Sequence, residues 1–281
     1  MAKIIDGKAI SAQIREEIKE EVAEFTAKHG FAPSLTVVIV GEDPASQVYV
    51  RNKHKACEQV GITSDIISLP ADTPEDVLLS LIDRLNNDKA VNGILVQLPL
   101  PKHINEKNII CRISPQKDVD AFGYENVGRI LTGDFDFLPC TPAGVMELLH
   151  RSDITVSGKD CVVIGRSNIV GKPMSMLMLR ENATVTVCHS RTKNLSEVTK
   201  RADILIVAIG KPKMIDASYV KDGATVIDVG IHRVDPNSKK LCGDVDFDSV
   251  EPVAGKITPV PGGVGPMTIA MLMSNLVNSV E

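Results

Sequence analysis

The sequence contains few aromatic residues, which restricts how it could hold a flat ligand. Aromatic residues make up 3% of the 281 positions, tryptophan is absent and tyrosine occurs three times. Stacking on aromatic rings is a common way of binding bases and similar flat groups, so here it must fall to very few side chains. Tyr49 is therefore a candidate ligand contact.

The chain also lacks a basic excess and a long apolar run. Its net charge of −5 argues against a general nucleic-acid or membrane-surface binder, which would normally be basic. No apolar run approaches the roughly 20 residues of a transmembrane helix, and the start MAKIIDGKAI lacks the apolar segment of a signal peptide. We expect a soluble, cytoplasmic protein that binds neither nucleic acid nor membrane.

Cysteine and histidine show no metal-binding spacing. The six cysteines include no C-x-x-C pair, and the six histidines are scattered without an H-x-x-x-H. Cys161 and Cys188 fall inside apolar runs. We expect reduced, buried thiols of a cytosolic protein and no metal site.

Helices and strands are expected to alternate in the first half of the chain. Apolar residues at helical spacing predict a helix over 6–29, and the β-branched run SLTVVIVG predicts a buried parallel strand over 34–41. Thr73 is expected to cap a later helix, with Pro74 at its first position. The other expected elements are a helix at 44–60, a strand near 66–70, that capped helix at 73–88 and a strand at 91–101. The alternation indicates an α/β fold.

A second alternating series follows residue 140. Thr141 is expected to cap a helix over 141–152, and Pro266 to begin a last helix over 265–281. Between them, strands are expected at 161–165, 184–189, 203–210 and 224–230. The simplest division is two α/β units that meet near residue 140, and the last helix could pack on either of them.

The turn between Gly165 and Gly171 predicts a dinucleotide site. It follows a strand and precedes a helix, with Ser167 at the middle glycine position of a G-x-G-x-x-G. Such a turn seats a pyrophosphate on the N-terminus of the helix. After the next strand an NAD site would show an acidic residue, whereas this chain has Ser190 and Arg191, with Arg166 in the turn. Their donors and charge suit a 2′-phosphate and favour NADP over NAD; the alternative is a solvated basic corner.

Lys53 falls on the apolar side of its predicted helix. At 100° per residue, it shares one arc with Tyr49, Val50, Ala56, Cys57 and Val60. A lysine that only adds solubility would be misplaced there. The alternative is a buried stem whose ammonium reaches water.

Three further segments carry candidate site residues. Gln97 lies near the carboxyl end of an apolar strand, where open α/β sheets bind their ligands. Asp120 lies in QKDVDAF, whose two acids could instead cap a helix. The rigid segment TPVPGGVGPMT, residues 258–268, is either the start of a helix or a place where backbone approaches a ligand closely.

Motifs along the whole chain resemble those of one family. In order they read YVRNK, GILVQLPLP, KDVDAF, GRSNIVGKP, CHSRT, DVGIHR…GDVDF and PVPGGVGPMT. The chain thereby resembles the bifunctional methylenetetrahydrofolate dehydrogenase/methenyltetrahydrofolate cyclohydrolase family. The resemblance implies a homodimer of subunits with two α/β domains and a cleft between them. It implies a catalytic folate-binding domain of residues 1–140 plus 267–281 and a Rossmann-like NADP-binding domain of residues 141–266.

The resemblance also implies which residues form the sites. Tyr49, Lys53, Gln97 and Asp120 match its active-site positions, and Pro261 and Gly262 match folate contacts. The cofactor positions are matched by Gly165, Arg166, Ser167, Ser190 and Ile231, to which the basic corner adds Arg191. After Asp120 the family commonly reads G-F-H-P, and this chain departs from it with Ala121, Phe122, Gly123 and Tyr124.

The implied activity has two steps in one-carbon folate metabolism. Methylenetetrahydrofolate is oxidised to a methenyl cation with NADP⁺, and water then opens that cation to 10-formyltetrahydrofolate. Tyr49 would stack on the folate, Asp120 would accept hydrogen bonds from the pterin, and Lys53 with Gln97 would serve the hydrolysis.

Three other functions are possible. Short-chain dehydrogenases also pair Tyr with Lys at this spacing, but there the pair follows the glycine turn, whereas Tyr49 precedes Gly165. A family member with only one of the two activities is a second alternative. The third is a non-catalytic NADP-binding or scaffold protein.

Overall fold

The computed structural model describes residues 1–234 and 240–280, and it divides into two compact units. The three-stranded unit comprises Gln13–Cys140 and Ile269–Glu281, and the six-stranded unit comprises Met1–Ala12 and Thr141–Thr268. Helices α1 (Gly7–His29) and α10 (Val264–Asn278) each contribute residues to both units. Both units are α/β, as the sequence predicts.

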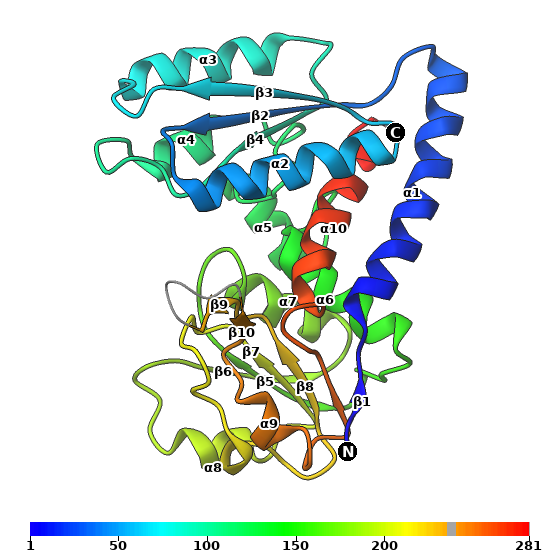
Figure 1. The fold of residues 1–281 in the computed structure, drawn as a ribbon, viewed down its shortest axis with the longest axis vertical. Helices are drawn as coiled ribbons and strands as arrows, with labels where there is room; N and C mark the ends of the chain where they lie inside the picture. Colours follow the sequence, from blue (N-terminus) through cyan, green and yellow to red (C-terminus); the bar gives the residue numbers. More distant parts are fainter. Residues whose placement is uncertain (235–239, 281) are drawn as a thin grey trace. The chain divides into compact units, whose positions relative to one another are not determined.

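The three-stranded unit is built on a parallel sheet in the order β3-β2-β4. Its strands are β2 (Ser34–Val40), β3 (Thr63–Leu69) and β4 (Gly93–Val96). Figure 1 shows α2 (Pro44–Gln59) and α3 (Glu75–Asn87) on opposite faces of this sheet. Side chains alternate along a strand, so Val38 and Val40 of β2 pack with α3 and with α4 (Glu106–Arg112) on one face.

The start of α3 differs from the prediction. Pro74 occupies the N-cap position, and the helix begins at Glu75 without a side-chain cap. The hydroxyl of Thr73 donates instead to the carbonyl oxygen of Pro70 at 2.7 Å. Thr73 closes the preceding turn, so the predicted cap is wrong.

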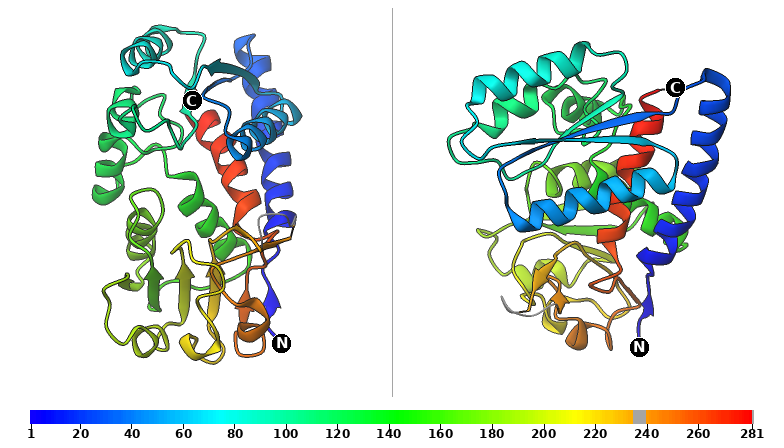
Figure 2. Two further views of the ribbon diagram at one scale, coloured as in Figure 1. Left: turned by 60° about the vertical axis from the view of Figure 1, so that its left-hand side comes forward. Right: turned by 45° about the horizontal axis from the view of Figure 1, so that its top comes forward.

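The six-stranded unit has an entirely parallel sheet in the order β1-β11-β8-β7-β5-β6. Its central strands are β5 (Asp160–Ile164), β7 (Ile204–Val207) and β8 (Thr225–Asp228), all fully buried except for the first residue of β5. The chain passes from β5 to β6 (Thr184–Cys188) on one side, then returns to β7 on the other. Ligands bind at such a reversal, outside the carboxyl ends of the strands. Figure 2 shows this sheet from two further directions.

The first residues of the chain complete this sheet. Strand β1 (Lys3–Ile4) pairs with β11 (Lys256–Ile257), which in turn pairs with β8. The predicted division assigned residues 1–12 to the other unit, because a two-residue strand leaves no recognisable pattern in a sequence. The pairing with β11 is the physical reason for the difference.

Helix α6 (Cys140–Arg151) begins one residue before its predicted cap. Thr141 therefore lies inside the helix, and its hydroxyl pairs with that of Thr268 at 3.0 Å. The remaining elements are α5 (Tyr124–Thr132), α7 (Gly171–Arg180), α8 (Leu195–Thr199), the 3-10 turn η1 (Ala217–Tyr219), α9 (Phe247–Val250) and the hairpin β9 (His232–Arg233) with β10 (Leu241–Cys242). Of these, the sequence predicts the helices between β5 and β7, namely α7 and α8.

All six cysteines are free thiols, as expected, but they are not all buried. Cys57, Cys140, Cys161 and Cys188 are buried, Cys242 is half-buried, and Cys111 is exposed on α4. Within residues 1–234 and 240–280, no helix has both the length and the apolar character that crossing a membrane requires.

Candidate active site

Lys53 and Gln97 meet in the three-stranded unit. The Nζ atom of Lys53 on α2 donates to Oε1 of Gln97 at 3.3 Å. Gln97 directly follows β4, and its own amide nitrogen donates to the carbonyl oxygen of Leu98 at 2.6 Å. That bond fixes the orientation of the Gln97 amide, so its oxygen faces the lysine. The structure thus brings together a lysine and a glutamine 44 residues apart in the chain.

The burial of Lys53 confirms the predicted apolar arc. Only 6% of the residue is exposed, and Val50, Cys57 and Val60 beside it are buried. The Nζ atom bonds to the Gln97 amide inside the protein, so the structure does not show the alternative in which the end of the side chain reaches water. Tyr49 lies at the edge of the arc, 38% exposed, with the Lys53 Nζ atom 5.0 Å from the centre of its ring.

Cys140 contacts Asp120 and also lies within electrostatic reach of Lys53. The thiol of Cys140 lies 3.6 Å from Oδ1 of Asp120. Burial raises the pKa of the Cys140 thiol well above its usual value; the negative charge of Asp120 raises this pKa further, and the positive charge of Lys53 opposes the rise. Burial therefore keeps Cys140 a neutral thiol.

Asn275 holds the backbone on both sides of this thiol. From the C-terminal helix α10, its side-chain amide donates to the carbonyl oxygens of Val119 at 2.8 Å and Leu138 at 2.7 Å. Asp120 directly follows Val119, and Cys140 lies two residues after Leu138. Asn275 is not among the residues that the sequence predicts, although an asparagine on the apolar side of a helix is a usable signal.

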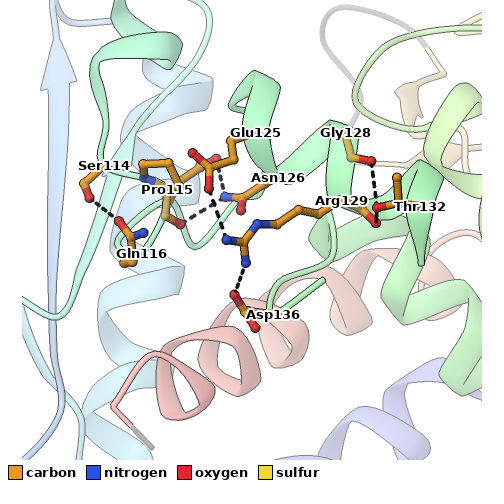
Figure 3. Close-up of polar contacts among 10 residues, drawn as sticks. Ser114, Pro115, Gln116, Glu125, Asn126, Gly128, Arg129, Thr132 and Asp136 are labelled. Carbon is orange, nitrogen blue, oxygen red and sulfur yellow. Dashed lines mark hydrogen bonds and ion pairs between the residues drawn. The ribbon is translucent and has the colours of Figure 1, made fainter. Parts of the chain in front are cut away.

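The segment that carries Asp120 is anchored by a second acid, Asp118. Its carboxylate is buried and accepts from the backbone of Gly123 at 2.7 Å and from the Asn126 amide at 3.0 Å. Figure 3 shows Asn126 reaching from α5 toward Pro115, to whose carbonyl oxygen the same amide nitrogen donates. Asp118 holds the loop by its bond to Gly123, and Asp120, which lies between these two residues in the chain, keeps a partly exposed side chain.

Helix α5 is tied to its surroundings by Arg129. Its guanidinium bonds to Glu125 on the same helix and to Asp136 beyond the end of that helix (Figure 3). This ion pair network is partly exposed and contributes little by itself. Together with Asn126 it keeps α5 in place next to the Asp118 loop.

Asp118 should give the protein a pH-dependent stability. Burial raises the pKa of its carboxyl from 3.8 to about 6, although its hydrogen bonds oppose the rise. The folded protein therefore keeps a proton that the unfolded chain loses between about pH 4 and pH 6. We expect the free energy of unfolding to fall by about 2–3 kcal/mol over this range relative to Asp118→Asn, which has no proton to lose. Urea unfolding of both proteins at pH 4 and pH 7 measures the difference, and parallel changes would contradict it.

The departure from the family pattern after Asp120 has a visible backbone consequence. Ala121 has φ of 55°, in the left-handed region where glycine, the usual family residue here, meets no steric penalty. Gly123 stands at the N-cap of α5, and its N–H donates to Asp118. Ala121 thus adopts a left-handed turn that disfavours a residue with a Cβ atom.

The glycine turn of the six-stranded unit has the shape of a phosphate cradle. Gly165 follows β5 with φ of 133°, and a Cβ atom there would overlap the carbonyl oxygen of Ala208. A Cβ atom on Gly171, at the start of α7, would overlap the backbone of Gly165. The Ser167 hydroxyl accepts from the N–H groups of Val170 and Gly171, both at 3.2 Å. The two glycines let the turn pack tightly between β5, the β7 loop and the start of α7, and a dinucleotide site places its pyrophosphate at such a turn.

The basic corner lies at the end of the neighbouring strand. The N–H of Gly165 donates to the carbonyl oxygen of Cys188, the last residue of β6, at 2.9 Å. The exposed residues Ser190 and Arg191 follow in a turn closed by His189 and Thr192. Arg166 and Arg191 therefore come from adjacent strand ends, as a site for a 2′-phosphate requires.

The other predicted positions of this unit lie at the carboxyl ends of β8 and β11. Ile231 follows β8 and is exposed, and the Pro261–Gly262 segment follows β11, with a cis bond between Val260 and Pro261. The predicted cofactor residues thus all lie in the six-stranded unit, together with Pro261 and Gly262, whereas the other predicted folate residues lie in the three-stranded unit. Among the described residues, no cluster of His, Cys, Asp or Glu could hold a metal ion.

Comparisons with known proteins identify a family for both parts of the chain. Residues 5–120 match the catalytic domain of tetrahydrofolate dehydrogenase/cyclohydrolase, and residues 139–281 match its NAD(P)-binding domain. Bifunctional protein FolD of Agathobacter rectalis is 66% identical over 281 residues, which cover 100% of both chains.

Solved structures are similar over almost the whole length. The bifunctional methylenetetrahydrofolate dehydrogenase/cyclohydrolase of Campylobacter jejuni is 50% identical, with a TM-score of 0.96 and 99% and 98% of the two chains covered. The Trypanosoma brucei dehydrogenase–cyclohydrolase, solved with NADP and an inhibitor, is 40% identical, with a TM-score of 0.95 and coverage of 99% and 97%. The chain belongs to the tetrahydrofolate dehydrogenase/cyclohydrolase family.

Proposed function

We propose that this chain carries out both family reactions and that Lys53 is the central residue of the second. The first oxidises 5,10-methylenetetrahydrofolate to the methenyl cation with NADP⁺, and the second hydrolyses that cation to 10-formyltetrahydrofolate. The observation that carries the proposal is the buried Lys53 amine hydrogen-bonded to Gln97. The three-stranded unit then carries the catalytic residues Lys53 and Gln97, and the six-stranded unit carries the cofactor-binding residues.

The six-stranded unit offers a continuous row of cofactor contacts. Its strand order places the segments after β6, β5, β7, β8 and β11 side by side at one edge of the sheet. Four strand spacings span roughly 19 Å, which suits an extended dinucleotide. Gly165 and Ser167 would hold the pyrophosphate, Ser190, Arg166 and Arg191 the 2′-phosphate, and Ile231 the end near the substrate. NADP⁺ supplies the hydride acceptor when it is bound.

The folate is held by residues of different character. The exposed ring of Tyr49 offers a stacking surface, and the Asp120 carboxylate accepts hydrogen bonds from the polar edge of the pterin. Pro261 and Gly262 supply backbone that a ligand can approach closely. Hydride transfer depends chiefly on orientation, so these residues contribute to the first reaction by fixing the folate.

Hydrolysis of the cation needs a group that takes a proton from the attacking water. Lys53 suits this role in its uncharged form, because a second positive charge beside the cation would be repelled. The Gln97 amide oxygen holds the amine at 3.3 Å, and its orientation is fixed by its bond to Leu98. A side chain positioned in this way accelerates proton transfer by roughly 10²–10⁴-fold.

The family resemblance also supports a proposal about the oligomeric state and one about the location in the cell. We propose that the chain works as a homodimer and that it acts in the cytoplasm. Gel filtration with light scattering tests the first, and a mass near twice 30.3 kDa is expected.

A spectrophotometric assay tests both reactions and the cofactor together. Purified protein is mixed with methylenetetrahydrofolate and either NADP⁺ or NAD⁺, and the reduced cofactor and the methenyl absorbance are followed. We expect reduction with NADP⁺ followed by loss of the methenyl absorbance. Because Arg166 and Arg191 favour a 2′-phosphate, we expect a much lower KM for NADP⁺ than for NAD⁺. Equal kcat/KM for both cofactors would disprove the assigned preference, and inactivity in both steps would disprove the function.

A further inference from the structure

A buried carboxylate, Asp244, joins two loops of the six-stranded unit. It has no solvent exposure, and its Oδ2 atom accepts from the N–H groups of Ile209 at 2.7 Å and Gly210 at 3.0 Å. Its Oδ1 atom accepts from the backbone N–H of Lys211 at 2.8 Å and from the His232 ring at 2.7 Å. A buried charge is tolerated only when such donors satisfy it.

These donors come from the loops that follow two adjacent strands. Ile209, Gly210 and Lys211 follow β7, and His232 follows β8 directly after Ile231. The β7 loop also approaches the glycine turn, because a Cβ atom on Gly165 would overlap Ala208. Asp244 therefore links the loop behind the pyrophosphate turn to the loop that carries Ile231.

A second carboxylate, Asp228, completes the link. It accepts from the N–H of Gly230 at 2.9 Å and from the N–H of Asp244 at 3.0 Å. Both neighbours of Ile231 in the chain are therefore bonded, Gly230 to Asp228 and His232 to Asp244. The two acids pack closely enough that glycine is needed around them. A Cβ atom on Gly230 would overlap Asp244, and one on Gly243 would overlap Asp228.

We propose that Asp244 and His232 are positioning residues for NADP⁺, which hold the Ile231 loop in the conformation that binds the cofactor. Neither is a catalytic residue, because they act through Ile231 and through the loop after β7. This inference rests on the proposed function, which assigns Ile231 to the cofactor. His232 is the member that can be tested, because its side chain is partly exposed whereas Asp244 is fully enclosed.

Two substitutions of His232 separate positioning from simple packing. His232→Leu removes the ring N–H that Asp244 accepts, and His232→Gln returns an amide N–H at a similar reach. Hydrogen bonds to a charged group are the stronger ones, so we expect His232→Leu to raise the Kd for NADP⁺ about tenfold. His232→Gln should stay within about twofold of wild type. Titration calorimetry with NADP⁺ alone measures both without any turnover.

Hydrolysis of methenyltetrahydrofolate without NADP⁺ serves as the internal control. Its proposed proton transfer uses Lys53 and Gln97 of the three-stranded unit, so its rate should be the same in both variants and in wild type. The inference is overturned if His232→Leu binds NADP⁺ as wild type does, or if hydrolysis falls in parallel with binding. If His232→Leu does not fold, His232→Ser removes the same donor and is judged by the same two results. Failure of wild type in the two assays would instead count against the proposed function.

Discussion

Lys53→Met should lower the rate of methenyltetrahydrofolate hydrolysis by roughly 10²–10⁴-fold. Methionine has nearly the length and apolar stem of lysine, so it suits the buried position where Lys53 is 6% exposed. What it removes is the amine that bonds to Gln97 and takes the proton. Loss of the methenyl absorbance, recorded with methenyltetrahydrofolate as the substrate, measures this rate directly.

Lys55→Met is the matched control, because Lys55 lies on the exposed side of the same helix. It should leave hydrolysis within about twofold of wild type, as is usual for a surface change remote from the site. The assignment fails if folded Lys53→Met hydrolyses the cation at the wild-type rate. Circular dichroism confirms that both variants keep their secondary structure.

Gly165→Ala should destabilise the protein by about 3 kcal/mol and abolish tight NADP⁺ binding. The new methyl group would overlap the carbonyl oxygen of Ala208, and the backbone at φ of 133° is unfavourable for any residue with a Cβ atom. Relief requires the turn to move away from the β7 loop, which opens the cradle. Urea unfolding measures the stability loss, and calorimetric titration measures the binding.

Gly158→Ala separates the cost of a positive φ from the cost of the overlap with Ala208. Gly158 also has positive φ, 74°, but nothing lies within 4 Å of the Cβ position. It should therefore lose only the conformational term, about 1 kcal/mol, and keep NADP⁺ binding. Equal losses from the two variants would show that the contact with Ala208 is unimportant.

The sequence predicts the features that depend on local pattern. The apolar arc containing Lys53 places that residue in the interior, and its burial with Val50 and Cys57 confirms the prediction. The strands β2 and β5 also lie where their β-branched runs predict them. In each case the controlling force is burial of one face, which leaves a periodic record in the residues.

Other features depend on partners distant in the chain and leave no such record. Thr73 has the chemistry of a helix cap, yet it bonds to Pro70 because the turn before α3 brings that carbonyl within reach. Asn275 and Asp244 acquire their roles from backbone groups more than 30 residues away. Which polar group each of them satisfies is decided only when the chain has folded.

The positions of the catalytic and cofactor residues rest on different kinds of information. The Lys53–Gln97 hydrogen bond is an observed contact, whereas the roles of Pro261 and Ile231 stay predictions from the family resemblance. The supporting residue Asp118 was present in the same motif as Asp120. Residue type alone could not tell which acid is enclosed and which faces outward.

Each unit combines segments that are far apart in the chain, which has a consequence for synthesis on the ribosome. The six-stranded unit needs β1 from the beginning of the chain, and the three-stranded unit needs Asn275 from its end. The six-stranded unit can therefore be completed only after β11, the partner of β1, has left the ribosomal tunnel, and the three-stranded unit only after Asn275 has left it. Both units should therefore fold late, although domains that are continuous in sequence can fold one after another during translation. For the same reason, a gene cut after the codon for Cys140 should yield two incomplete halves that depend on each other to fold.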